Sequence, residues 1–392
     1  MQSRFPSSAG SPARSLILAI LVVSFSLLTV GESLAAILRV ASWNMANRPN
    51  DATQESQMSM ILQAMGTETV QGNAARLGLL SMSETDPTSA EATAATLNTL
   101  YAGSSYQAVY SNPDGGSDRT GFVYDTTMLA LESVTELSTA AGLTHNILRG
   151  EFSLAGAADD LRFFMYSIHL KSGGSSADEN QRLAEADFIR ADGDLLGEGV
   201  NIIYGGDFNW SSSDERGTDV DSAWDAIVSA GEGQGFDAYD TTNVNGAGDW
   251  RDNPDFVHLH TQDPGAAMDD RFDMHFFSDE WFDGMGLELI QDSFRVFGND
   301  GMHMLNGPIT SGMGASPEVL LALAGFSDHL PVVSDFQYST QAVPEPPTVI
   351  LFAFVLVAFT LPPWLKQRWC LRSTNPGVLI MTASRFWTRM TK

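Results

Sequence analysis

Apolar residues along this chain recur in short runs, some alternating and some continuous, and the segments between several of these runs have helical spacing. Ile37–Trp43 alternates and predicts a strand. Leu161–Leu170 is strongly apolar and predicts a buried strand, and Ala177–Leu196 places its apolar residues on one helix face. Asn201–Tyr204 predicts the next buried strand. This order of strand, helix and strand is the signature of an α/β fold.

The same patterns predict further elements, and no repeat of 20–50 residues is evident. The additional strands are expected over residues 76–82, 106–110, 118–124, 128–134, 271–278 and 330–336. The additional helices are expected within residues 51–75, 89–101, 223–230 and 316–324. Residues 211–268 are rich in Asp, Gly and Asn and predict a long surface insertion.

Both ends of the chain have the pattern of sorting segments. Residues 1–36 combine two arginines, an apolar run too short to span a membrane comfortably, and a Ser-Leu-Ala sequence, which together predict a signal peptide. An N-terminal membrane anchor is the alternative. Residues 341–368 contain VPEP, the apolar run Thr348–Trp364 and a basic flank, and they predict a transmembrane helix at the short edge of the usual length. A buried core helix is the alternative there, and residues 369–392 form a basic tail of unknown role.

Composition narrows the class of protein. The chain has 392 residues, 43% of them hydrophobic and 18% charged, so a large folded core over residues 37–340 is expected. Its one cysteine, Cys370, excludes an intrachain disulfide. With 48 acidic against 21 basic residues the formal charge is −27, which makes non-specific binding of nucleic acid unfavourable.

Candidate chemistry centres on the sequence NIIYGGDFNW. Gly205 and Gly206 are expected to let the backbone turn sharply after the strand, and Asp207 and Asn209 then lie on the same side of extended backbone. Carboxyl ends of strands are where open α/β sheets usually place their active sites. Such residues also occur in ordinary turns, so this sequence leaves both interpretations open.

Other predicted strands also end in polar residues. The set comprises Asn44, Glu84, His169, Asp207, Asn209, Asp328 and His329. Its oxygen ligands suit a hard divalent cation such as Mg²⁺ or Mn²⁺, with Ca²⁺ also compatible, and no cysteine is among them. The two histidines remain for proton transfer or for stabilising negative charge, and this combination suits hydrolysis of a phosphate ester. A single histidine at a strand end is more often structural.

The motifs ASWNM, LSMSET, DRTGFVY, SIHLKSG, YGGDFN, DDRFD and FSDHLPV occur in that order. Over residues 37–340 the chain therefore resembles the endonuclease/exonuclease/phosphatase family, which includes deoxyribonuclease I-like nucleases, sphingomyelinases and inositol polyphosphate phosphatases. The resemblance implies a four-layer α/β sandwich of two packed, mostly antiparallel sheets flanked by helices. It also implies metal-dependent cleavage of phosphoester bonds.

The resemblance also implies roles for individual residues. Glu84 resembles the main metal ligand, with Asn44 and Asp328 as supporting ligands. Ser83 departs from the family, where many members have Gln at that position, and this removes an amide next to the metal ligand.

The catalytic roles follow in the same way. Asp207 is similar to the residue that orients or activates water, and Asn209 to one that holds phosphate. His329 resembles the catalytic histidine, with Asp273 as the acid that orients it.

His169 resembles the second histidine of the nuclease branch, and a looser local alignment makes Asp118 its partner. Lys171 and Arg119 are expected to contact the substrate phosphate. The other arginines that could line the cleft are Arg48, Arg149, Arg182 and Arg271. So few basic residues would hold one phosphate or a short strand, and not a long duplex.

The C-terminal segment resembles the PEP-CTERM sorting signal, which implies processing by an exosortase and a membrane-attached precursor. Here the chain continues beyond the basic cluster to Lys392, which departs from that pattern. The sequence thus predicts an exported, monomeric phosphodiesterase or nuclease. Two alternatives stay open: a phosphatase or sphingomyelinase-like enzyme on small or lipid phosphoesters, and a non-catalytic surface binding protein.

Overall fold

The structure is a computed structural model that describes residues 35–340, apart from 115, 117, 158, 218, 219 and 245, together with 370–375 and 378–382. It divides the chain into a unit Ser33–Gln341 and a second unit that combines Met1–Glu32 with Ala342–Lys392. The predicted C-terminal apolar helix lies outside the described residues, and so does the predicted signal peptide apart from Ala35 and Ala36, which begin the first strand. In the second unit, β16 (Cys370–Asn375) pairs antiparallel with β17 (Val378–Thr382).

The first large sheet has seven strands in the order β13-β15-β1-β4-β6-β5, and β14 pairs with β15. Within it, β1 and β4 are parallel and the other pairs are antiparallel. The strands are β1 (Ala35–Asn44), β4 (Leu77–Thr85), β5 (Tyr106–Tyr110), β6 (Arg119–Asp125), β13 (Leu287–Leu289), β14 (Arg295–Val296) and β15 (Val332–Ser339).

The second large sheet has six strands in the order β11-β12-β10-β9-β8-β7, and its β9 and β10 are parallel. Its strands are β7 (Leu129–Leu137), β8 (Ile147–Leu154), β9 (Arg162–His169), β10 (Ile202–Asp207), β11 (Phe236–Asp237) and β12 (Asp273–Phe277). The sequence pattern missed β8. Its residues alternate in burial, but Arg149, Gly150 and Glu151 interrupt the apolar positions.

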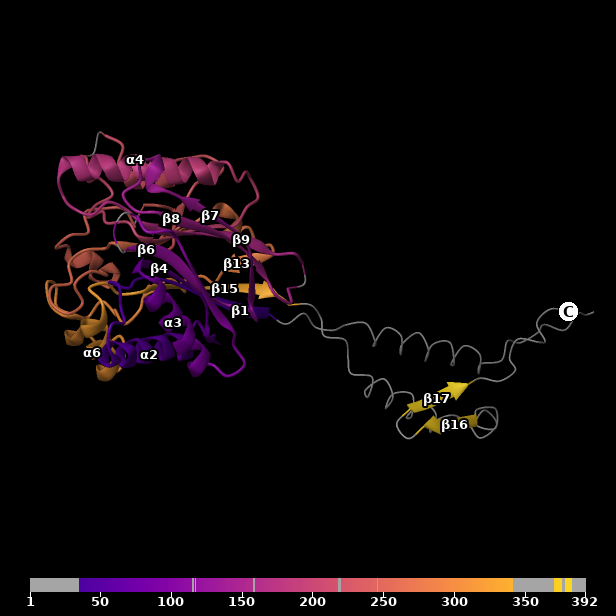
Figure 1. Cartoon of the computed structure of the whole chain (residues 1–392). Helices are drawn as coiled ribbons and strands as arrows, with labels where there is room; N and C mark the ends of the chain where they lie inside the picture. The colour runs from indigo at the N-terminus through magenta and orange to yellow at the C-terminus, as the bar shows by residue number, and fades with distance from the viewer. Residues whose placement is uncertain are drawn as a thin grey trace, which may run out of the picture. The chain divides into compact units, whose positions relative to one another are not determined.

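Helices cover the outer face of each sheet, so the unit Ser33–Gln341 has four layers (Figure 1). The first sheet packs against α2 (Ala52–Thr67), α3 (Pro87–Leu100) and α6 (Pro317–Phe326), and the second against α4 (Ser176–Asp194) and α5 (Ala223–Val228). These helices begin after side chains that cap backbone amides, namely Asp51, Asp86, Ser175, Ser222 and Ser316. The mixed α/β fold with two large sheets flanked by helices is confirmed.

Alternation along β1 shows how the sequence builds two cores at once. Leu38 and Val40 belong to the core between the sheets, whereas Ala41 and Trp43 pack with the helices of the first sheet. Because successive side chains of a strand point to opposite faces, a strand buried on both faces is apolar almost throughout.

Short pieces complete the unit: β2 (Thr69–Val70), β3 (Asn73–Ala74) and the 3₁₀ turns Thr139–Ala141, Pro254–Leu259, Asp279–Phe282 and Ile309–Ser311. Every helix in the described part of the chain is too short or too polar to span a lipid bilayer.

One predicted local feature is wrong. Gly205 and Gly206 do not turn the chain, since β10 continues through both to Asp207. A side chain at Gly205 would meet Ser42 Oγ at 2.6 Å, and one at Gly206 would meet the Ile168 carbonyl oxygen at 2.1 Å. The glycines therefore allow close packing of β10 between its neighbours, which is a tertiary requirement that looks like a turn signal in the sequence.

A buried ion pair joins β1 and β15, which are neighbours in the first sheet although they are far apart in the sequence. Arg39 donates from Nε and Nη2 to the two carboxylate oxygens of Asp335, at 2.7 Å each, and both side chains are fully buried. Arg39 also donates from Nη1 to the Met65 carbonyl at the end of α2, at 2.5 Å. This one side chain therefore links β1, β15 and α2.

We predict that Arg39→Met lowers the free energy of unfolding by about 3–5 kcal/mol, because it leaves a buried carboxylate without its main partner. Urea unfolding followed by circular dichroism measures the loss. Arg162→Met is the matched control, since Arg162 pairs with Glu151 and Asp160 at the surface, and its unfolding midpoint should hardly change. The double variant Arg39→Met, Asp335→Leu should recover part of the stability, and a single variant as stable as the unmodified chain would contradict the role of the pair.

Candidate active site

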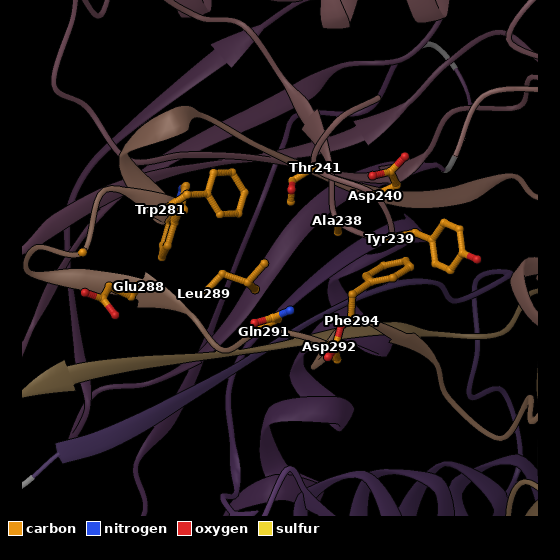
Figure 2. Close-up of a pocket in the computed structure, with 12 residues that line it drawn as sticks. Ala238, Tyr239, Asp240, Thr241, Trp281, Glu288, Leu289, Gln291, Asp292 and Phe294 are labelled. Atoms are coloured by element: carbon orange, nitrogen blue, oxygen red, sulfur yellow. The ribbon is translucent and has the colours of Figure 1, made fainter. Parts of the chain in front are cut away.

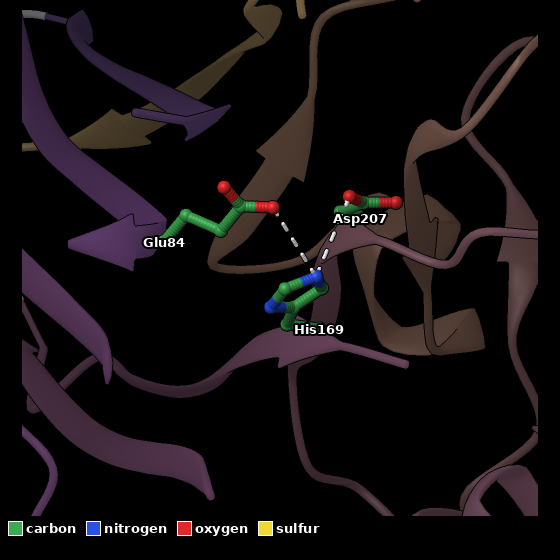
Figure 3. A group of neighbouring side chains, drawn as sticks. All are labelled: Glu84, His169 and Asp207. Carbon is green, nitrogen blue, oxygen red and sulfur yellow. Dashed lines mark ion pairs between the residues drawn. The ribbon is translucent and has the colours of Figure 1, made fainter. Parts of the chain in front are cut away.

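The two parallel strand pairs end at the same edge of the sandwich. A hydrogen bond of 2.8 Å from Ser167 Oγ to the Met82 carbonyl oxygen joins β9 to β4 just before these ends. Glu84 near the end of β4, His169 at the end of β9 and Asp207 at the end of β10 consequently face one another (Figure 3). One ligand atom of each lies within 4.8 Å of the others.

Backbone geometry aims Glu84 into this cluster. The pairing of β4 with β6 shifts register between Met82 and Thr85, and Glu84 has a φ of 44°. A bulge of this kind re-aims a side chain at the edge of a sheet. A non-glycine residue in the left-handed region is also strained, by about 1–3 kcal/mol, and such strain persists only where the surroundings enforce it.

Asn44, at the end of β1, bridges the two carboxylates. Its Nδ2 donates to Glu84 Oε1 and to Asp207 Oδ2, at 3.0 Å each, and its Oδ1 accepts from the backbone N–H of Ala46. In this orientation the amide contributes hydrogens to the cluster, and its oxygen faces Ala46. The role of Asn44 as a metal ligand stays a prediction.

Asn209 does not share one side of extended backbone with Asp207, which corrects the expectation from spacing. Its φ of 55° lies in the left-handed region, and its own N–H donates to Asp207 Oδ1 at 3.0 Å. The Asn209 side chain donates to the Leu170 carbonyl oxygen at 3.1 Å. Asn209 thus holds Asp207 in place through its backbone N–H and connects the ends of β9 and β10 through its side chain. The backbone forms an Asp-x-Asn turn here and not the expected extended conformation.

Burial raises the pKa of both carboxylates in the cluster. For Glu84 the hydrogen bond from Asn44 opposes that shift, and the charge of Asp207 adds to it. For Asp207, whose side chain is 1% exposed, the positive charge of His329 opposes the shift, and Asp273 adds to it. The cluster therefore holds more negative charge than its surroundings stabilise. Burial lowers the pKa of His169 to about 3, so its ring is neutral at physiological pH.

His329 and Asp273 form a second pair beside the cluster, as predicted from the sequence. His329 Nδ1 donates to Asp273 Oδ2 at 2.7 Å, while His329 Nε2 lies 3.7 Å from Asp207 Oδ2. Burial alone would lower the pKa of His329, but the charges of Asp273 and Asp207 and the hydrogen bond to Asp273 raise it to about 10. The His329 ring is therefore cationic at neutral pH.

The donor set fits a divalent cation. Two carboxylates and one neutral imidazole converge, and the raised pKa values of both carboxylates show that positive charge would be favourable there. The distances from His169 Nε2 to Glu84 Oε1 and to Asp207 Oδ2 are 3.7 and 3.8 Å, which are too long for hydrogen bonds. The Nε2 atom of His169 is thus close to both carboxylate oxygens without forming a hydrogen bond to either. Carboxylates suit Mg²⁺ and Mn²⁺, and an imidazole ligand also suits other divalent transition metals.

Asp328 and Asp118 are two further site residues predicted from the sequence. Asp328 is exposed, its carbonyl oxygen accepts from the Asp263 N–H at 2.7 Å, and its charge raises the pKa values of Glu84 and His329. Asp118 accepts a hydrogen bond of 2.6 Å from Asn47 Nδ2. The roles of Asp328 as a ligand and of Asp118 as the partner of His169 stay predictions.

The basic residues expected to hold phosphate are engaged within the chain. Lys171 Nζ donates to the Ser172 carbonyl and lies 3.3 Å from Asp178 Oδ1. Arg119 donates to the Ser111 carbonyl oxygen at 2.5 Å. The remaining arginines have the following partners: Arg48 the Phe326 carbonyl, Arg149 Asp192, Arg182 Glu215 and Arg271 Asp237.

The sequence reasoning missed one residue at this site. His145, in the loop before β8, stacks on His169 with ring centroids 3.9 Å apart. It lies in no recognisable motif, and only the tertiary structure brings it to the end of β9.

A separate cavity of about 590 Å³ opens elsewhere in the same unit (Figure 2). Its walls include the aromatic residues Tyr239, Trp281 and Phe294 and the acidic residues Glu288 and Asp292. None of the site residues predicted from the sequence lines it. The strand-end cluster therefore remains the candidate active site.

No protein-family model and no curated protein matches this chain. Solved structures do match it. The catalytic domain of human Nocturnin with bound sulfate has 15% identity and a TM-score of 0.49, over 78% of this chain and 96% of that one. D. rerio TDP2 complexed with single-strand DNA product has 16% identity and a TM-score of 0.49, over 77% and 99%. An endonuclease/exonuclease/phosphatase from Bacteroides vulgatus has 16% identity and a TM-score of 0.48, over 77% and 99%. At this identity the likeness is one of fold.

We predict that Mn²⁺ or Mg²⁺ raises the melting temperature of the chain and that EDTA reverses the effect, because a cation that binds only the folded state stabilises it. Differential scanning calorimetry measures the shift. Glu84→Gln should abolish it, whereas Glu288→Gln, a carboxylate of β13 in the separate cavity, should leave it unchanged. An equal shift in Glu84→Gln would place the cation elsewhere.

Proposed function

We propose that this chain is a divalent-metal-dependent phosphoester hydrolase that acts on phosphodiesters. The observation that carries the proposal is the meeting of two different groups at one edge of the sandwich. Glu84, His169 and Asp207 offer ligands for a cation, and the Asp273–His329 pair offers a buried positive charge beside them. A metal site next to a cationic histidine can neutralise the charge that develops on phosphate oxygens during phosphoester hydrolysis.

A bound divalent cation would supply a Lewis acid that neutralises charge on a phosphate oxygen. Asp273 fixes the His329 ring through Nδ1, which leaves the Nε2 hydrogen directed towards the cluster. That hydrogen stabilises the negative charge that grows on the phosphate oxygens in the transition state. Asp207, whose Oδ2 lies 3.7 Å from His329 Nε2, is the carboxylate placed to orient the attacking water and to accept its proton.

Nucleic acid is the first candidate substrate, as expected from the paired histidines. Small or lipid phosphoesters are the second, and the pairing of the basic side chains favours them. Arg182 and Arg271 are buried in ion pairs with Glu215 and Asp237, so they cannot turn towards a phosphate backbone without leaving those carboxylates unpaired. The net charge of −27 repels polyanions further.

We also propose that the protein is exported and acts as a monomer. The export proposal is supported by the signal-peptide pattern of residues 1–36 and by the PEP-CTERM-like pattern of residues 341–368. The C-terminal segment would attach the precursor to a membrane, and an exosortase would then process it. Cell fractionation with an antibody against the chain tests this proposal. Recovery of the full-length chain in the cytoplasm alone would contradict it.

We predict that Asp273→Asn and His329→Ala each lower kcat by about 10²–10⁴-fold, because each removes the oriented positive charge beside the phosphate. Steady-state hydrolysis of bis-p-nitrophenyl phosphate with Mn²⁺ measures the effect. Asp279→Asn is the matched control, because Asp279 is an exposed carboxylate beyond the other end of β12. Unchanged turnover in both active-site variants would contradict the proposed reaction.

We predict that EDTA abolishes all hydrolysis. We also predict that the chain prefers small or lipid phosphoesters to nucleic acid, because several of its basic side chains are already paired with carboxylates. The full chain is incubated with plasmid DNA, RNA, bis-p-nitrophenyl phosphate and sphingomyelin, each with Mg²⁺ or Mn²⁺. Hydrolysis of only the small or lipid esters would support the second candidate. EDTA-sensitive nicking of plasmid would establish the nuclease, and hydrolysis of none of the four would contradict a phosphodiesterase and favour a non-catalytic role.

A further inference from the structure

The rings of His145 and His169 form a close parallel stack. Their centroids are 3.9 Å apart and their planes differ by 6°. His169 ends β9 inside the candidate active site, while His145 lies in the loop that leads into β8. Both rings are mostly buried, with side-chain exposures of 5% for His169 and 18% for His145.

His169 lacks the hydrogen bond that usually orients a metal-binding histidine. A ligand histidine normally donates its second ring N–H to a carboxylate or a carbonyl, and this fixes the tautomer and the ring plane. Here both polar contacts of the His169 ring, with Glu84 and with Asp207, involve Nε2. Within the part of the chain that the structure describes, no protein group is hydrogen-bonded to Nδ1 of His169. The flat ring of His145, in contrast, is in stacking contact with the His169 ring.

His145 is itself held firmly. Its Nδ1 donates to Asp114 Oδ2 at 2.5 Å, and Asp114 Oδ1 accepts from the Gly116 N–H at 3.1 Å. The next residue, Asn146, donates to the Asn112 carbonyl oxygen at 2.9 Å. The loop between β5 and β6 and the loop before β8 are thus tied together, and His145 cannot rotate without breaking the bond to Asp114.

We propose that Asp114 and His145 form a positioning pair that fixes the ring plane of His169 and so directs its Nε2 towards Glu84 and Asp207. The inference rests on the proposed function only in that His169 serves a divalent cation. The stack replaces the missing hydrogen bond at Nδ1, because a flat ring packed at van der Waals distance blocks rotation of its neighbour about the bond to Cβ. His145 acts through His169 and is a positioning residue.

Ring shape and hydrogen bonding can be separated by substitution. His145→Ala removes the stack, whereas His145→Phe keeps a flat ring and loses the bond to Asp114. Asp114→Asn weakens the anchor and leaves both rings in place. If the stack is what orients His169, His145→Phe should resemble the unmodified chain more closely than His145→Ala does.

The test is Mn²⁺ binding to the full chain, freed of metal with EDTA and titrated by electron paramagnetic resonance. We expect His145→Ala to weaken Mn²⁺ binding by about 10-fold or more, the range for loss of a group that orients a ligand. His145→Phe should recover most of that loss, and Asp114→Asn should fall between the two. His258→Ala is the matched control, since His258 packs against Tyr239, a residue of the separate cavity.

Circular dichroism first establishes that each variant is folded, and His145→Phe and Asp114→Asn serve if His145→Ala is not. Mn²⁺ affinity unchanged by His145→Ala would overturn the inference. So would equal weakening in His145→Phe and His145→Ala, together with a raised KM, because His145 would then contact the substrate itself. An unmodified chain that binds Mn²⁺ but hydrolyses no phosphoester would refute the proposed function, while the difference between the His145 variants would still support the positioning pair.

Discussion

Two carboxylates held close together, with Asp207 buried and Glu84 partly buried, are the constraint on which this site depends. Glu84 and Asp207 would each be more stable in water, and their proximity adds repulsion to the loss of hydration. The surroundings offset this cost only in part, through the amide hydrogens of Asn44 and the positive charge of His329. The remaining excess of negative charge is what makes a divalent cation a favourable addition and gives the cluster its chemistry.

The scaffold keeps this unfavourable arrangement in place through features far apart in the sequence. Strand β4 places Glu84 with a bulge and a left-handed backbone, and the glycines of β10 let that strand pack close to its neighbours. The Arg39–Asp335 pair fixes β1 to β15, and His329 lies just before β15 in the chain. A displaced strand would therefore disturb the ligands and the cationic histidine together.

The distribution of positive charge separates this site from a general nucleic-acid cleft. Arg149, Arg182 and Arg271 have carboxylate partners within the fold, and Lys171 lies beside Asp178. The one cation directed into the cluster is His329, among the residues that the structure describes around it. Under the proposed function, a site of this kind would hold a single phosphate group through a bound cation and one histidine.

The sequence by itself predicted the fold class, most strands and helices, the places of Glu84, His169 and Asp207 at strand ends, and the pairing of Asp273 with His329, because strand patterns and motif order are local properties. It misjudged the glycines of β10 and the direction of Asn209, since close packing and turn conformation depend on neighbouring strands. Only the tertiary structure decided that the arginines are paired and that His145 stacks on His169. Such contacts join residues distant in sequence, and nothing in the local pattern of either partner records them.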